Sequence, residues 1–85
     1  MSFEWDAEKS IANKEEHGID FETAKLLWSD KNRVEIHAPY PVEDRWILIG
    51  KKENKLWTVI FDELVKSHIP YVVHASTSLA RTEYQ

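Results

Sequence analysis

Four histidines are the side chains of this chain best suited to proton transfer, because imidazole titrates close to neutral pH. They are His17, His37, His68 and His74. His74 closes an apolar run and His17 directly precedes a glycine, whereas the other two fall in or near expected loops. No pair of them has the spacing of a metal site supported by a second cluster of ligands. We therefore expect acid–base chemistry that uses neither a metal ion nor a cofactor.

Arg45 is the most informative cation, because it stands at the start of an expected strand directly after Glu43 and Asp44. Its planar guanidinium suits two roles equally: an ion pair that fixes the adjoining loop, or contact with a phosphate group. Glu43 or Asp44 could serve as a general base only if burial raised its pKa. Lys14 could supply a second cation, although an exposed lysine on a helix is usually only solvated.

A basic group formed by Lys51, Lys52 and Lys55 lies next to an aromatic residue, Trp57. Basic and aromatic side chains together suit single-stranded nucleic acid, whereas a lysine-rich hairpin tip more commonly serves solubility. The formal charge of −4 opposes strong non-specific binding to nucleic acid, because phosphate neutralisation requires lysine and arginine. A local basic patch remains compatible with that charge.

The composition predicts one small domain over residues 1–85. Hydrophobic residues make up 42% of the chain and charged residues 31%, which is a globular balance rather than a disordered one. The longest apolar runs are too short to cross a bilayer, and acidic residues occupy the place where a secretion signal would be basic and then apolar. We therefore expect a cytoplasmic protein with no membrane attachment.

Two helices are expected in the first half, after a minimal strand around Phe3 and Trp5. Asp6 can cap a helix over residues 7–17, and Gly18 can end it in the left-handed conformation. The apolar stripe of this helix would contain Ala7, Ile11 and the stem of Lys14. Asp20 can cap a second helix that starts at Phe21 and ends at residues 29–32.

The second half changes to a period of two, which indicates strands. We expect strands over residues 33–37, 45–50, 56–61 and 71–75, with a hairpin loop at 51–55. Residues 62–68 are polar enough for a connection, although Leu64 and Val65 could extend the preceding strand. Pro70 lacks the N–H group that a strand needs, so the last strand should begin at or after it. Together these elements predict an α+β fold, with two N-terminal helices packed on a small antiparallel sheet. Of the four tryptophans, Trp5, Trp28 and Trp57 should lie in the core, and a partner could cover one face of Trp46.

The chain resembles the BrnT family of toxins in its opening residues. The run Phe3-Glu4-Trp5-Asp6 is followed by Lys9, Asn13-Lys14, His17-Gly18-Ile19 and Phe21-Glu22 with Ala24, at the family's spacing. Asp44-Arg45 and the apolar run to Ile49-Gly50 are similar to a family strand that ends in Ile-Gly. The resemblance implies a RelE-like fold and a ribonuclease toxin. It also implies an RNA substrate and a cognate DNA-binding antitoxin of the BrnA type, with which a higher-order toxin–antitoxin complex would form.

Cleavage of RNA without a metal requires a base for the ribose 2′-hydroxyl, an acid for the leaving oxygen and a cation for the developing charge. The candidates for these catalytic roles are Arg45, His74, Lys14, His17 and Glu43. The candidates for RNA binding are Lys51, Lys52, Lys55 and Arg81. His17 has an alternative structural role, because the end of a helix favours a positive charge by itself. His74 has one too, as a strand-edge histidine bonded to backbone.

The second half departs from the family pattern. Leu64 stands where BrnT proteins usually have an arginine, and His74-Ala75-Ser76 replaces a terminal Ser-Ala-Arg motif. Only Arg81 is basic in the short tail. The leading hypothesis is an RNA endonuclease that blocks translation and is neutralised by its antitoxin. The alternative is a BrnT-like interaction module with weak or lost ribonuclease activity. A DNA-binding accessory protein fits less well, because the chain is acidic and lacks a helix-turn-helix pattern.

Overall fold

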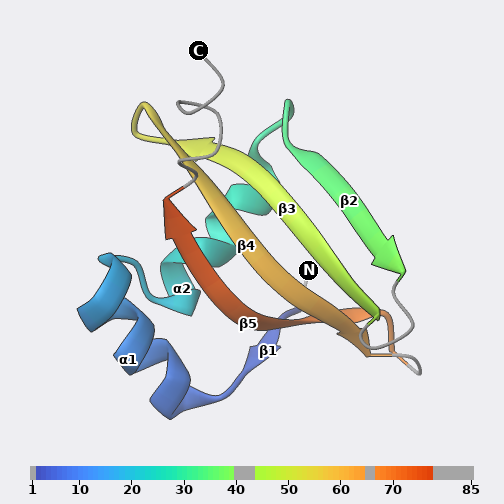
Figure 1. Cartoon of the computed structure of the whole chain (residues 1–85), viewed down its shortest axis with the longest axis horizontal. Helices are drawn as coiled ribbons and strands as arrows, with labels where there is room; N and C mark the ends of the chain where they lie inside the picture. The colour runs from blue at the N-terminus through green and yellow to red at the C-terminus, as the bar shows by residue number, and fades with distance from the viewer. Residues whose placement is uncertain (1, 40–43, 65–66, 78–85) are drawn as a thin grey trace.

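A computed structural model describes residues 2–39, 44–64 and 67–77 and contains three helical segments and five strands within them (Figure 1). In order they are β1 (Glu4–Trp5), α1 (Ala7–His17), α2 (Phe21–Ala24), the 3₁₀ helix η1 (Lys25–Ser29), β2 (Val34–Pro39), β3 (Asp44–Lys52), β4 (Lys55–Leu64) and β5 (Ile69–Thr77). Helical segments and one sheet form separate layers, which confirms the α+β class. Figure 1 shows α2 behind the sheet and α1 beside β5.

Helix α1 begins and ends where the sequence predicts. The carboxylate of Asp6 accepts hydrogen bonds from the backbone N–H groups of Glu8 and Lys9, at 2.9 and 3.0 Å. Gly18 adopts φ = 81° and donates its N–H to the carbonyl of Lys14 at 2.9 Å. A residue with a side chain is strained at this angle, so glycine is the natural end of the helix.

The buried face of α1 is polar, and the predicted apolar stripe is wrong. Ser10 and Asn13 are buried, whereas Ile11 is 63% exposed and Lys14 is exposed. The physical reason is the surface that α1 meets. Its neighbour is the backbone edge of β5, whose N–H and C=O groups need hydrogen-bond partners rather than methyl groups.

The second helix is short and tightens into a 3₁₀ helix, instead of continuing as one α-helix from Phe21. Its predicted cap is confirmed, since Asp20 accepts a hydrogen bond from the N–H of Thr23 at 2.8 Å. η1 packs closely on β3 at Gly50. A Cβ atom at that position would lie 3.3 Å from both the Cβ and the carbonyl oxygen of Leu27. Glycine therefore permits the close approach of helix and sheet.

The sheet is mixed, with the strand order β1-β5-β4-β3-β2. Strands β2 to β5 form an antiparallel meander, as predicted, but β1 pairs in parallel with β5 through Glu4↔Tyr71 and Trp5↔Val72. Parallel pairing needs a long connection, and the helices and three strands that separate β1 from β5 supply it. A two-residue strand gives too little pattern to reveal its partner.

The hairpin strands are longer than predicted. β3 runs to Lys52 and β4 starts at Lys55, so the turn consists of Glu53 and Asn54, with φ angles of 53° and 65°. Two positive φ angles are typical of the type I′ turn that closes tight hairpins. Residues 62–64 belong to β4 rather than to the connection, so the strand extends to Leu64 as the alternative allowed, and β5 begins at Ile69.

The core lies between the sheet and the helices. It contains Ile19, Phe21, Ala24, Leu27, Trp28, Leu48, Trp57, Val59, Phe61, Val72 and Ala75. Trp28 and Trp57 are thus core residues as predicted, and Trp5 is partly buried against the same cluster. The register of β4 and β5 shifts between Ile60 and Phe61, which makes Val73 an extra residue in β5. No helical segment in the described part of the chain has the length and hydropathy of a membrane span.

Candidate active site

Two histidines that are 57 residues apart in sequence meet at the junction of α1 and β5. The Nε2 atoms of His17 and His74 lie 3.2 Å apart. Their ring centres are 4.7 Å apart and the ring planes are inclined by 75°. Both side chains are partly buried. The sequence predicts each residue as a candidate separately, and the structure brings the two together as one pair.

Asn13 holds α1 against β5 and so fixes the position of His17. Its amide nitrogen donates to the carbonyls of Ile19 and Ala75 at 2.7 and 2.8 Å, and its amide oxygen accepts the N–H of Ala75 at 3.2 Å. The side chain thereby satisfies both backbone groups of the residue that follows His74. β1 pairs with the edge of β5 only as far as Val72, and Asn13 provides the hydrogen-bond partners for the backbone of Ala75 beyond that point.

Ser10 performs a related task one turn earlier on α1. Its hydroxyl oxygen accepts the backbone N–H of Phe21 at 2.9 Å, which fixes the start of α2. Together, Ser10 and Asn13 tie α1 to the next helix and to the sheet. Much of the opening sequence signature is therefore architecture, and His17 is the member of it that contacts His74.

The extra residue in β5 sets the direction of His74. Val72 pairs with Phe61, whereas His74 pairs with Ile60, and Val73 has no partner of its own in this register. A bulge of this kind redirects the side chains that follow it. It lets Val72 and Ala75 both be buried while His74 contacts α1 at the sheet edge.

The environment of His74 favours its neutral form. Burial lowers the pKa of His74, and the neighbouring His17 lowers it further, while Glu16 acts in the opposite direction. A neutral imidazole with a free lone pair can act as a general base near pH 7. The two Nε2 atoms are at hydrogen-bond distance, so one of them carries the proton between them and the other accepts it. The pair can therefore present one proton donor and one proton acceptor at the same time.

Arg45 lies outside the histidine pair. Its Nε atom is 3.4 Å from Oδ1 of Asp62 on β4, and both side chains are about one-third exposed. From the spacing of residues and strands, the backbone of Arg45 is about 12 Å from that of His74. One ion-pair partner of Arg45 thus lies on the neighbouring strand β4.

Lys14 lies one helical turn before His17, and its ammonium group donates to the carbonyl of Gly18 at 3.4 Å. Of the lysines on α1, Lys14 is closer in sequence to His17 than Lys9 is. Glu43 and Arg81, also candidates from sequence, lie outside the described residues.

The three hairpin lysines are strand residues rather than loop residues. The acidic Glu53 stands at the tip, and its carboxylate lies 3.4 Å from the ammonium group of Lys52. The backbone N–H of Lys51 donates to Asp30 at 2.8 Å. The prediction of a basic hairpin tip is therefore wrong. The type I′ turn needs only Glu53 and Asn54, so the lysines lie on the flanking strands.

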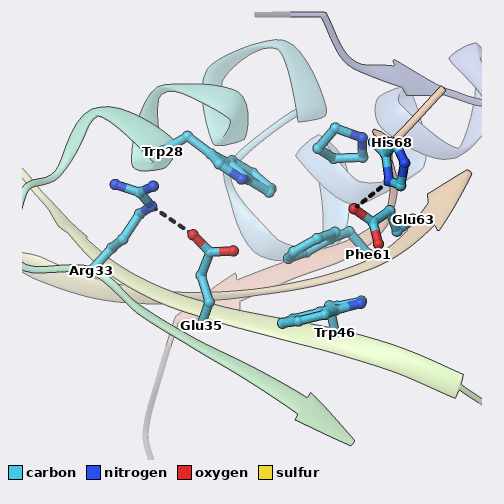
Figure 2. Close-up of a pocket in the computed structure, with 8 residues that line it drawn as sticks. Trp28, Arg33, Glu35, Trp46, Phe61, Glu63 and His68 are labelled. Atoms are coloured by element: carbon cyan, nitrogen blue, oxygen red, sulfur yellow. Dashed lines mark hydrogen bonds and ion pairs between the residues drawn. The ribbon is translucent and has the colours of Figure 1, made fainter. Parts of the chain in front are cut away.

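A second feature is an aromatic pocket on the helical side of the sheet (Figure 2). Trp46 at its floor is stacked on His37 of β2, with ring centres 4.5 Å apart and planes inclined by 15°. His37 is thus a residue of strand β2, and it covers one face of Trp46, for which we expected a partner. The pocket's lining is Trp28, Arg33, Glu35, Trp46, Phe61, Glu63, His68 and Pro70. Sequence reasoning missed Arg33, Glu35 and Glu63 as site residues, and the signal for the two glutamates was alternation with apolar residues on β2 and β4.

Comparison with known proteins identifies the family. A family model described as the ribonuclease toxin BrnT of a type II toxin–antitoxin system matches residues 5–72. A search of curated proteins finds no significant match. The matched region includes His17 and Arg45 and ends two residues before His74. Since it covers most of the 85 residues, the chain belongs to the BrnT family of ribonuclease toxins.

Proposed function

We propose that this protein is an endoribonuclease that acts in the cytoplasm, blocks translation, and is neutralised by complex formation with a BrnA-like antitoxin. Membership of the BrnT family supports a toxin with an antitoxin partner. The observation that carries the enzymatic part is the contact of His17 with His74, in which burial and the neighbouring ring favour a neutral His74. A RelE-like arrangement of helices and sheet belongs to the same proposal.

The chemistry follows from the two histidines. His74 accepts the proton of a ribose 2′-hydroxyl, whose oxygen attacks the adjacent phosphorus. The bond from phosphorus to the 5′-oxygen breaks, and protonated His17 donates its proton to that oxygen. The products are a 2′,3′-cyclic phosphate and a 5′-hydroxyl. The substrate phosphate must separate the two rings from their 3.2 Å contact. Lys14 supplies positive charge on the same helix as His17, and Arg45 binds another phosphate further along the RNA chain.

Cleavage of a labelled RNA by the purified protein tests this proposal. We expect His17→Gln and His74→Gln to reduce the cleavage rate by about 10²–10⁴-fold each, the usual contribution of general acid–base catalysis. Lys9→Gln, an exposed change eight residues before His17 on α1, should leave the rate unchanged. Full activity in both histidine variants would refute the site assignment. Absence of cleavage by the unmodified protein, with normal growth of cells that express it alone, would refute the ribonuclease function.

A second function is favoured by one observation on the other side of the molecule. Val34 and Ile36 on the edge strand β2 are 50% and 45% exposed. Exposed apolar residues on an edge strand favour an interaction surface. The alternative is therefore an interaction module with weak or lost cleavage. It predicts that an antitoxin binds the His17→Gln/His74→Gln protein normally while the unmodified protein does not cut RNA.

A further inference from the structure

The aromatic pocket lies at a different place from the histidine pair and has its own chemistry. It is an open cavity of about 130 Å³ between η1 and strands β2 to β5. Figure 2 shows Trp28 on one side of it and Trp46 and Phe61 on the other, with Arg33 and Glu35 at one end and His68 and Glu63 at the other. We propose that this pocket binds one guanine base of the RNA. This inference rests on the proposed ribonuclease function and names the sequence feature that the enzyme reads.

The walls of the pocket are flat aromatic rings, of which Trp46 is partly buried and Trp28 and Phe61 belong to the core. Trp28 meets Phe61 edge to face, with ring centres 5.0 Å apart. Phe61 and Trp46 are nearly parallel, with ring centres 6.3 Å apart and planes inclined by 18°. Trp46 is supported from β2 by His37, which limits its freedom to turn away. Bases of single-stranded RNA bind to proteins mainly by stacking on such aromatic side chains.

The size of the cavity selects a base rather than a whole nucleotide. The volume of about 130 Å³ is close to that of a protein cavity of about 150 Å³ that binds one benzene molecule. This is much smaller than the cavities that enclose drug-sized ligands. A base can enter while its ribose and phosphate stay outside, where the pocket is open.

The charged ends of the pocket match the edges of guanine. At one end, Nε of Arg33 donates to Glu35 at 2.9 Å, and at the other, Nδ1 of His68 lies 3.5 Å from the carboxylate of Glu63. Guanine presents N7 and O6 to a guanidinium, which is a common arginine contact. It also presents two adjacent donors, N1–H and N2–H, on the Watson–Crick edge, and a carboxylate can accept both.

The other bases and the phosphate fit this arrangement less well. Adenine, cytosine and uracil each place an acceptor beside the donor on the Watson–Crick edge, and a carboxylate repels that acceptor. A phosphate would meet two carboxylates, Glu35 and Glu63, within one small pocket. The rim therefore favours a neutral base with paired donors over the charged backbone.

The pocket reads a base that is not the one at the cleaved bond. Pro70, which lines the pocket, precedes His74 by four residues on β5, or about 13 Å of strand. The guanine would thus lie at a fixed offset along the RNA from the point of cleavage. Glu35 and Glu63 are specificity-determining residues in this scheme rather than catalytic ones.

Binding of short RNA oligonucleotides tests the proposal without requiring cleavage. The probes are five-residue 2′-O-methyl oligonucleotides, which lack the attacking hydroxyl, with G, A, C or U at the centre of a uridine run. Tryptophan fluorescence of the full chain reports binding. We expect the G probe to bind about tenfold more tightly than the others, and Glu35→Gln to remove most of that preference. Glu53→Gln, at the hairpin tip, is the matched control and should retain it.

Each outcome decides between the two proposals. Equal binding of all four probes, or a G preference that survives both Glu35→Gln and Glu63→Gln, overturns the guanine pocket. If the preference holds but no RNA is cleaved, the pocket stands and the ribonuclease proposal fails. If RNA is cleaved, cut-site mapping should show guanine at one fixed offset for the unmodified protein and for Glu53→Gln, and Glu35→Gln should lose that guanine preference. Cleavage without such an offset refutes the pocket alone.

Discussion

Replacing Asn13 with alanine should be among the most destabilising single changes in this chain, although it removes only a small polar side chain. Asn13 is 6% exposed and makes three hydrogen bonds to backbone groups of Ile19 and Ala75. Alanine leaves two carbonyls and one N–H group without these partners at the junction of α1 and β5. The helix would lose its attachment to the sheet edge.

The size of the effect follows from those three bonds. An unsatisfied buried polar group costs about 1–3 kcal/mol, but water can reach some of the freed groups once α1 loosens. We therefore expect a loss of about 2–4 kcal/mol in the free energy of unfolding. A chain of this length has about 4–13 kcal/mol of stability in total. The variant should thus be folded only marginally, with His17 separated from His74.

Urea unfolding of the purified protein measures this change. Asn32→Ala is the matched control, because Asn32 lies on an exposed turn, and it should shift stability by less than about 0.5 kcal/mol. Asn13→Asp adds a second check. Its carboxylate can still accept the N–H of Ala75 but cannot donate to the two carbonyls, so it should be at least as destabilising as alanine. A loss below about 1 kcal/mol in Asn13→Ala would refute the view that this side chain joins helix to sheet.

Three further predictions concern the pH dependence, the helix end and the ion pair. Since the folded-state pKa of His74 is depressed, stability should fall as pH drops through about 6.5, by no more than about 1.4 kcal/mol per pH unit. The difference between the urea midpoints at pH 7.5 and pH 5.5 should be smaller in His74→Gln than in the unmodified protein. In His68→Gln the difference should stay as large as in the unmodified protein. Gly18→Ala should cost about 1 kcal/mol, entirely from its positive φ, because nothing lies within 4 Å of the added Cβ. Thermal unfolding measures it, and no change in melting temperature would contradict the strain. A double-mutant cycle of Arg45 and Asp62 should give a coupling of at most about 1 kcal/mol, because both side chains are partly exposed. A larger coupling would mean that the pair is shielded from water.

The features that sequence predicts well are those set by nearby residues. Asp6 and Gly18 lie next to the helix that they begin and end, and both act as expected. The strands of the meander follow the alternation of apolar residues, which depends on one face of a sheet being buried. Short-range hydrogen bonds and side-chain period decide these elements, and the sequence displays both.

The features that sequence misses depend on contacts between distant segments. Asn13 is buried because the edge of β5, 62 residues away, needs hydrogen-bond partners. His17 and His74 each look like a surface or strand-edge histidine until the fold joins them. The 3₁₀ turn at Leu27 reflects the close packing of η1 on Gly50. None of these neighbours can be recognised from local spacing.

The extra residue in β5 has a consequence for how related chains are aligned. Because Val73 has no partner of its own, a chain without it would keep Phe61 opposite Val72 and Ile60 opposite His74, so the imidazole would stay on the same face of the sheet. A relative that lacks the bulge would differ by a single gap just before this histidine, and a gap placed one or two positions away would pair the wrong side chains. Gain or loss of this one residue would therefore change the local twist of β5 at His74 but not the face on which the imidazole lies.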